Sequence, residues 1–166
     1  MKDLALLLIA GGKSSRFGGE PKMLSKIGPN DETLFEMSIC QMINHIHIVQ
    51  IHIVVNKENK EKIMEEVKRG NQYDGIIMDP PAFGIGAKKE RWKIETKFPE
   101  LVQLASQLLS KNGFLIINTY SPKLKEELIQ STVKEFFPSK KIEINTLSLK
   151  STTGKTLEYG QLTRVY

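Results

Sequence analysis

The chain has almost no cysteine, since Cys40 is the only one among 166 residues. A lone thiol cannot form an internal disulfide and fits a protein of a reducing compartment. Long apolar runs are also lacking: the longest, Leu4 to Ala10, is too short to span a bilayer. Lys2 and Asp3 make a poor start for a signal peptide. We therefore expect a cytoplasmic protein with no membrane partner.

No charge of one sign dominates the sequence. Lysine and arginine number 24 and aspartate and glutamate 19, which gives a net charge of +5 at pH 7. That balance fits a phosphate-bearing partner without requiring one, because the lysines are spread widely rather than blocked. The length and the hydrophobic content of 40% suit one domain, residues 1–166, with a sizeable core. Nothing in the sequence sets the oligomeric state.

Strand-like and helix-like patterns alternate along the chain. Strands are expected at 4–10, 46–55, 75–78, 114–119, 142–149 and 157–166, and helices at 33–44, 57–69, 99–110 and 122–137. Pro99 is expected in the first turn of its helix, and Asn112-Gly113 after its end. Four βα units and an antiparallel hairpin predict a three-layer α/β/α sandwich with a Rossmann-like, mainly parallel sheet. Ligands of such sheets bind beyond the carboxyl ends of the strands.

A glycine-rich basic stretch, Gly11 to Lys22 (GGKSSRFGGEPK), directly follows the first expected strand. Its glycines let the backbone bend tightly and bring N–H groups against an anion. Arg16 can grip two phosphate oxygens at once. The spacing matches neither the G-x-x-x-x-G-K-[ST] phosphate loop nor G-x-G-x-x-G. The stretch indicates a site for the phosphates of a nucleotide; the alternative is a basic surface loop with turn glycines.

Residues 10–22 resemble the opening of the GT-A-like nucleotidyltransferases of the molybdenum-cofactor and sugar type. In that family a strand is followed by Ala-Gly-Gly-x-Ser-x-Arg-x-Gly and then Pro-Lys, and the likeness here continues to about Asn59. The resemblance implies that the loop holds a nucleoside triphosphate and that Lys22, with Arg16, is catalytic by stabilising the leaving pyrophosphate. The implied nucleotide-binding residues are Gly11, Gly12, Ser15, Arg16, Gly18 and Lys22.

A second motif, Asp79-Pro80-Pro81-Ala82-Phe83-Gly84, follows the expected strand at 75–78. A carboxylate and backbone carbonyls in a proline-stiffened turn can accept hydrogen bonds from an amino group while an aromatic ring stacks on its plane. The alternative is that Asp-Pro-Pro simply ends a strand. Trp92 is expected to pack with Phe98 on the following helix, or else to stack on a base.

From about Glu66 to the end, the chain resembles class I S-adenosylmethionine-dependent methyltransferases, closest to those acting on ribosomal RNA. The resemblance implies S-adenosylmethionine as cofactor, RNA as partner, and a substrate pocket lined by Asp79, Pro80, Pro81 and Phe83. Three departures weigh against it. The first loop is long and basic, Asn56 stands where an acidic residue would bind ribose hydroxyls, and residues 118–121 (NTYS) lack a catalytic cysteine. The loop and Asn56 predict weak or no binding of S-adenosylmethionine, and the missing cysteine leaves cysteine chemistry without support.

The two resemblances meet near residues 64–68, so the chain looks like a splice of a nucleotidyltransferase-like half (1–65) and a methyltransferase-like half (66–166). If both share one sheet, the strands at 4–10 and 75–79 lie side by side, with Asp79 opposite Gly11-Gly12. Asp79 would then be a third catalytic residue and a ligand of Mg²⁺ held against a bound triphosphate.

Three functional hypotheses follow. The first is a nucleotide-binding, nucleotidyltransferase-like protein that takes Mg²⁺ with a nucleoside triphosphate and has little or no activity. The second is an S-adenosylmethionine-dependent methyltransferase-like protein acting on RNA. The third is a chimeric Rossmann-like scaffold without catalysis. The first ranks slightly above the second, because the loop after the first strand dictates the cofactor. In either active case the protein is a transferase.

Overall fold

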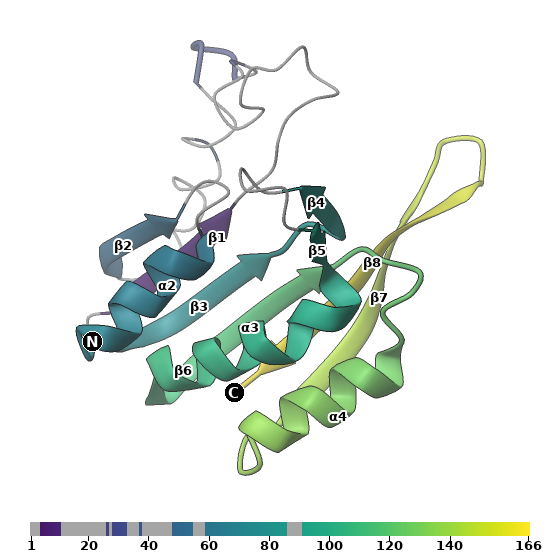
Figure 1. The fold of residues 1–166 in the computed structure, drawn as a ribbon. Coiled ribbons are helices and arrows are strands. Elements are labelled where there is room, and N and C mark those ends of the chain that lie inside the picture. The colour runs from purple at the N-terminus through teal and green to yellow at the C-terminus, as the bar shows by residue number, and fades with distance from the viewer. Residues whose placement is uncertain are drawn as a thin grey trace.

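The computed structural model describes residues 4–10, 26, 28–32, 37, 48–54, 59–85 and 91–166. These residues form an α/β fold in which helices pack on a six-stranded sheet, with a separate two-stranded sheet beside it (Figure 1). The elements are β1 (Leu4–Ala10), β2 (Ile48–Val54), α2 (Asn59–Lys68), β3 (Tyr73–Asp79), β4 (Phe83–Ile85), β5 (Arg91–Lys93), α3 (Ile94–Leu108), β6 (Leu109–Thr119), α4 (Glu126–Phe136), β7 (Ile142–Lys150) and β8 (Thr156–Val165). The helix expected at 33–44 lies outside them, apart from the helical Met37.

The large sheet has the strand order β2-β1-β3-β6-β8-β7. The pairs β1–β2, β1–β3 and β3–β6 are parallel, whereas β8 runs antiparallel to both β6 and β7. The sequence prediction of a mainly parallel sheet with a terminal antiparallel hairpin is therefore confirmed. The chain adds β2 on one side of β1 and β3 on the other, which places a topological switch point between the carboxyl ends of β1 and β3.

The expected neighbours β1 and β3 do lie side by side. Their register runs from Leu6 opposite Gly75 to Ala10 opposite Asp79, so the two strands end together. We call the border of the sheet formed by the carboxyl ends of β1, β3 and β6 the ligand edge. Gly11 and Gly12 lie outside the described residues, and what faces Asp79 from that loop stays a prediction.

The described helices cover one face of the sheet. Figure 1 shows α2, α3 and α4 next to one another, and contacts join α2 to α3 and α3 to α4. When successive strand–helix–strand connections proceed in one direction along a sheet, right-handed crossovers place their helices on the same face. Alternate residues of the central strands fill the layer between, with at most 1% of each exposed: Ile76, Met78, Leu115, Ile117 and Val165. In the sequence prediction of a three-layer sandwich, the helix expected at 33–44 supplied the third layer.

The start of α3 corrects the sequence prediction. The helix begins at Ile94 rather than Pro99, so Pro99 lies inside it. Pro99 offers no backbone N–H to the turn before it, which weakens a helix. Burial offsets that loss, because the added turn extends one apolar stripe. The buried residues of the stripe are Ile94, Phe98, Leu101, Val102, Ala105 and Leu108.

The end of α3 also differs from the prediction. The helix ends at Leu108 and β6 begins at Leu109, before the expected stop at Asn112-Gly113. Gly113 lies instead inside β6, at an irregularity in the pairing of β6 with β3. Tyr73 pairs with Leu109, whereas Gly75 pairs with Phe114. An added Cβ at Gly113 would meet the Asp74 carbonyl oxygen at 3.0 Å, so a glycine suits this close approach.

The terminal hairpin is longer than the sheet that supports it. β7 and β8 pair from Ile142–Val165 to Lys150–Thr156, whereas β6 pairs only with residues 161–165 of β8. We call residues 147–160, which extend past the last pairing with β6, the arm; it projects from the body in Figure 1. A β-bulge lies at its base, where Leu147 pairs with Gly160 but Ser148 pairs with Glu158.

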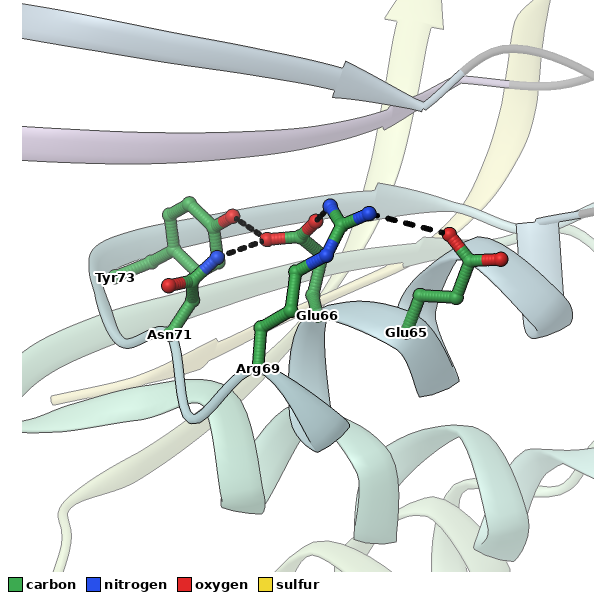
Figure 2. A network of polar contacts seen from close by, with 5 residues as sticks. All are labelled: Glu65, Glu66, Arg69, Asn71 and Tyr73. Atoms are coloured by element: carbon green, nitrogen blue, oxygen red, sulfur yellow. Dashed lines mark hydrogen bonds and ion pairs between the residues drawn. The ribbon is translucent and has the colours of Figure 1, made fainter.

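A polar network joins α2 to the amino end of β3, away from the ligand edge (Figure 2). The Glu66 carboxylate accepts hydrogen bonds from the Tyr73 hydroxyl at 2.6 Å, Asn71 Nδ2 at 2.6 Å and Arg69 Nη1 at 2.9 Å. These donors, Tyr73 foremost, lower the pKa of Glu66. Burial, followed by the hydrogen bond to Glu66, raises the pKa of Tyr73. The network fixes where the chain leaves α2 and enters β3.

Candidate functional site

Asp79 and Asn118 form the centre of the ligand edge. Asp79 is the last residue of β3 and is exposed, and Asn118 precedes the last residue of the neighbouring β6. Since Met78 pairs with Ile117, the next residues along each strand are neighbours on the same face. The Asn118 side chain uses this position: its Nδ2 donates a hydrogen bond to Asp79 Oδ1 over 3.1 Å.

The other end of the Asn118 amide is left without a partner. Its Oδ1 is buried and accepts no hydrogen bond in the described structure. Such a buried acceptor costs roughly 1–3 kcal/mol, so it calls for an explanation. Turning the amide over would set two acceptor oxygens against each other, because an ionised carboxylate only accepts. The second oxygen of the exposed Asp79 is therefore the accessible acceptor at the switch point, and the buried Asn118 Oδ1 lies on the neighbouring strand.

Hydrogen bonds from β5 and α3 hold the proline turn that follows Asp79. Trp92 Nε1 donates to the Pro81 carbonyl oxygen at 2.6 Å, and the Ile94 N–H donates to the Ala82 carbonyl oxygen at 3.1 Å. Trp92 is partly buried against the hydrophobic core, so its expected packing role is confirmed. Each of these two carbonyl oxygens accepts one hydrogen bond within the protein and keeps a second lone pair, so the expected role of the turn's backbone carbonyls stays a prediction.

Two exposed aromatic side chains follow these adjacent strands. Phe83 begins β4 with 58% of its surface exposed, and Tyr120 follows the end of β6 with 64% exposed. Pro80 is buried, whereas Pro81 is exposed like Phe83. Aromatic faces offer stacking surface to any planar ring. The motif from Asp79 to Phe83 thus combines an exposed carboxylate with an exposed aromatic ring.

Six cations lie on segments that follow the strands of the ligand edge or on the arm. They are Arg91 and Lys93 of β5, Lys123 and Lys125 between β6 and α4, and Lys150 and Lys155 of the arm. Among the described residues, none of these six lies within an ion pair, whereas Arg69 at the far edge is paired with Glu65 and Glu66. The nearby Glu95 keeps a lowered pKa, chiefly because the Ser121 hydroxyl donates to its carboxylate at 2.6 Å.

The predicted phosphate-site residues are not part of this geometry. Gly11, Gly12, Ser15, Arg16, Gly18 and Lys22 all lie outside the described residues, so their roles stay predictions. Within the described ranges, no group of three or more histidine, cysteine, aspartate or glutamate side chains is arranged to hold a metal ion. The metal role of Asp79 therefore also stays a prediction. No helix in the part of the chain that the structure describes is long and apolar enough to cross a membrane.

Sequence reasoning missed Asn118 as a site residue. It noted residues 118–121 only because they lack a cysteine. The signal that finds Asn118 is strand register, since a polar residue at the end of β6 lies next to Asp79 once the two strands are aligned through Met78 and Ile117.

No protein-family model matches the sequence. Among curated proteins, the chain is 26% identical over 106 residues to ATP synthase subunit b of Helicobacter acinonychis. It is 28% identical over 97 residues to the same subunit of Helicobacter pylori. The first match covers 64% of this chain, and the chain spans a little over half of the length of these relatives, 58% and 53%. Identity and coverage this low do not place the chain in that family.

Solved structures with a similar fold are methyltransferases. A SAM-dependent methyltransferase of Agrobacterium tumefaciens matches 99% of this chain with a TM-score of 0.67 and 16% identity. One from Streptococcus mutans matches 98% at 0.56 and 15%, and human methyltransferase-like protein 13 in complex with SAH matches 99% at 0.50 and 15%. The chain covers 56%, 44% and 72% of those proteins, respectively.

These likenesses extend over the whole chain, including the part expected to be nucleotidyltransferase-like. They support the methyltransferase resemblance and give no support to a nucleotidyltransferase half or to a splice of two folds. At such low identity they show the fold alone: this chain has the Rossmann-like fold of the SAM-dependent methyltransferases from end to end.

Proposed function

We propose that this chain is an S-adenosylmethionine-dependent, methyltransferase-like protein that acts on a planar, amine-bearing base of RNA. This reverses the ranking that the basic loop suggested. One observation carries the proposal: the Asp79–Asn118 pair, with an unpartnered acceptor, lies at the switch point of a sheet whose fold over the whole chain is that of methyltransferases.

Each residue of the site has a distinct part. An exocyclic amine would donate one N–H group to the second oxygen of the exposed Asp79, and the Asn118 amide would hold that carboxylate in place through its bond to Oδ1. Phe83, with 58% of its surface exposed, would stack on the ring and hold it in one plane. The Trp92 bond to the Pro81 carbonyl keeps the turn from moving when the base enters.

The described residues fit the cofactor in two respects. The site lies at a switch point, where open α/β sheets bind ligands beside the first strand. Its acceptors suit a ligand with a positively charged sulfonium, because carboxylate and amide oxygens favour nearby positive charge. When bound, S-adenosylmethionine supplies an electrophilic methyl group. Residues 11–25 and 55–58, which would surround the rest of the cofactor, lie outside the described ranges.

RNA as the substrate is supported by the charge around the site. Arg91, Lys93, Lys123, Lys125, Lys150 and Lys155 form no ion pair among the described residues, and Phe83 and Tyr120 add stacking surface. Cationic surfaces with exposed aromatic rings are typical of proteins that bind single-stranded nucleic acid.

Two measurements test the proposal. Calorimetric titration with S-adenosylmethionine and with Mg²⁺-ATP, side by side, should show heat of binding for the first only. Transfer of a tritiated methyl group to unmodified ribosomal RNA transcripts should then be lowered at least about 10-fold in kcat/KM by Asp79→Asn, the effect of losing a hydrogen bond to a charged group. The matched control is Glu127→Gln, an exposed carboxylate of α4, which should leave the rate unchanged.

The opposite pattern rejects the proposal. Binding of Mg²⁺-ATP without S-adenosylmethionine would restore the nucleotidyltransferase hypothesis, and Arg16→Ala should then weaken that binding by at least ~1 kcal/mol. Binding of neither ligand would leave the non-catalytic scaffold. Equal methyl transfer by wild type and Asp79→Asn would remove Asp79 from the site.

A further inference from the structure

We propose that the arm, residues 147–160, docks the phosphate backbone of the single-stranded RNA whose base enters the ligand edge. The inference rests on the proposed function for the identity of the acceptor. It assigns a role to the longest projection of the described structure, which the site at Asp79 does not explain.

The arm is on the correct side of the molecule for this role. β7 is antiparallel to β8, which is antiparallel to β6, so β7 runs in the same direction as β6 and β3. Thr119 pairs with Gln161, and Gln161 with Thr146, which makes this the last rung shared with β6. Residues 147–150 continue beyond that rung for roughly 13 Å at about 3.3 Å per residue. The arm thus extends past the level of Asp79, on the side of the sheet next to β6.

The arm carries more positive than negative charge. Lys150 and Lys155 are exposed and flank the turn, and Glu158 is the one acid in residues 147–160. Neither lysine is part of an ion pair among the described residues. Hydroxyl groups fill much of the rest: Ser148, Ser151, Thr152, Thr153 and Thr156. Lysine and hydroxyl side chains are the groups that most often contact phosphates and sugars.

The turn holds the two lysines in fixed relation. The Ser151 N–H donates to the Lys155 carbonyl at 2.7 Å, and the Lys155 N–H donates to Ser151 Oγ at 3.0 Å. Gly154 closes the turn with a φ of +81°, a conformation that favours glycine, and its N–H donates to the Ser151 carbonyl at 3.0 Å. A turn fixed in this way loses little entropy when it binds a strand.

The base of the arm is fastened to the strand that carries the site. Gly160 has a φ of +113°, and a Cβ there would collide with the carbonyl oxygen of Thr119. Thr119 is the residue between Asn118 and the exposed Tyr120. The direction of the arm is therefore set by β6 itself, and Lys123 and Lys125 add cations to the segment that follows β6.

A protein partner is the competing occupant. Leu149 and Leu157 pair across the arm and are 58% and 59% exposed, which gives the side opposite Lys150 an apolar spot. Two leucines are a small fraction of the roughly 800 Å² per partner that a stable interface buries. The unpaired lysines and hydroxyls therefore favour RNA over a second copy of the chain.

The test is RNA binding measured without cofactor. Fluorescence anisotropy with a fluorescein-labelled 12-nucleotide single-stranded RNA is compared for wild type, Lys150→Ala/Lys155→Ala, and the control Lys68→Ala/Lys111→Ala. The control removes the same charge from exposed lysines near the opposite edge, at the end of α2 and the start of β6. If each arm lysine neutralises one phosphate, the slope of log K against log salt falls by about 1.4, which is roughly 15-fold in affinity at 150 mM salt. Lys150→Arg/Lys155→Arg should retain wild-type affinity.

Three outcomes overturn the inference. One is unchanged affinity and slope in the alanine arm variant, and another is an equal loss in the control. The third combines two results: Leu149→Ser/Leu157→Ser changes the sedimentation coefficient, and the lysine variants bind RNA like the wild type. Together they would show that the arm is a contact between copies of the chain. The proposed function fails separately: absent binding of S-adenosylmethionine rejects it while the arm-dependent RNA binding, measured without cofactor, still stands.

Discussion

Replacing Tyr73 by phenylalanine isolates one bond of the network in Figure 2. Tyr73 is 2% exposed, and its hydroxyl donates to the Glu66 carboxylate, which is 12% exposed, over 2.6 Å. A hydrogen bond to a charged group contributes about 1.5–3 kcal/mol. Glu66 keeps Asn71 and Arg69 as donors, so its charge is not left bare. We expect Tyr73→Phe to lower the free energy of unfolding by about 2 kcal/mol.

Tyr166 provides a matched control, since its hydroxyl donates to Glu143 over the same 2.6 Å. That bond lies at the surface, where Tyr166 is 48% exposed, and interactions between exposed charged groups contribute about 0–1 kcal/mol. Urea unfolding followed by circular dichroism at pH 7 should separate the two variants. In thermal unfolding, Tyr73→Phe should lower Tm by roughly 4–8 °C for a chain of this size.

The deficit of Tyr73→Phe should narrow at both ends of the pH scale. The lowered pKa of Glu66 stabilises the fold above the ordinary value of 4.5, and that contribution is lost as the pH falls through the folded-state pKa. The raised pKa of Tyr73 stabilises it below the ordinary value of 10.0, and this is lost as the pH rises through the folded-state pKa. The full deficit is therefore expected between these two values.

Three results would refute this reasoning. They are a deficit below about 0.5 kcal/mol at pH 7, an equal deficit in Tyr166→Phe, or a Tyr73→Phe deficit that does not shrink at pH 3. Any of them would mean that the Glu66 network does not stabilise the packing of α2 against β3.

Two further stability predictions follow from single backbone positions. Gly160→Ala should lower the free energy of unfolding by at least about 1–3 kcal/mol, measured by urea unfolding, because its positive φ and the Thr119 carbonyl both disfavour a side chain. Gly154→Ala, also at positive φ but with open space around it, should cost less than Gly160→Ala. Pro99→Ala should raise stability by about 1 kcal/mol by restoring a backbone donor inside α3, and unchanged or lower stability would show that the helix has adapted to the proline.

The fold was predictable where local pattern and tertiary need agree. The apolar runs of β1 and β3 each require neighbours on both edges, which is why their pairing followed from sequence. The start of α3 was not predictable by the same means, because the rule for proline is local and the burial of Ile94 and Phe98 that overrides it is not. The bulge at the base of the arm depends on the approach of Gly160 to another strand, which no local pattern contains.

Only part of the candidate site could be proposed from the sequence. Asp79 and Phe83 belong to one short motif and were proposed from it, and their roles stay predictions. Asn118 is 39 residues from Asp79 and becomes its neighbour only through strand register. The role of Trp92 was foreseen as packing, but its hydrogen bond to Pro81 depends on the antiparallel pairing of β4 with β5. The first ranking of the cofactors rested on the loop at residues 11–22, whereas the likeness in fold over the whole chain supports the S-adenosylmethionine alternative.

The central place of β1 in the sheet has a consequence for synthesis on the ribosome. Leu4 pairs with Ile48 and Leu6 with Gly75, so β1 waits for partners that are made 44 and 69 residues later. At about 5–20 residues per second, the second interval is roughly 3–14 s. A two-stranded β1–β2 ribbon is marginal in water until more strands join it. The nascent chain therefore exposes an apolar strand for seconds, and a holding chaperone should bind truncated nascent chains that end before residue 73 more than those that include β3.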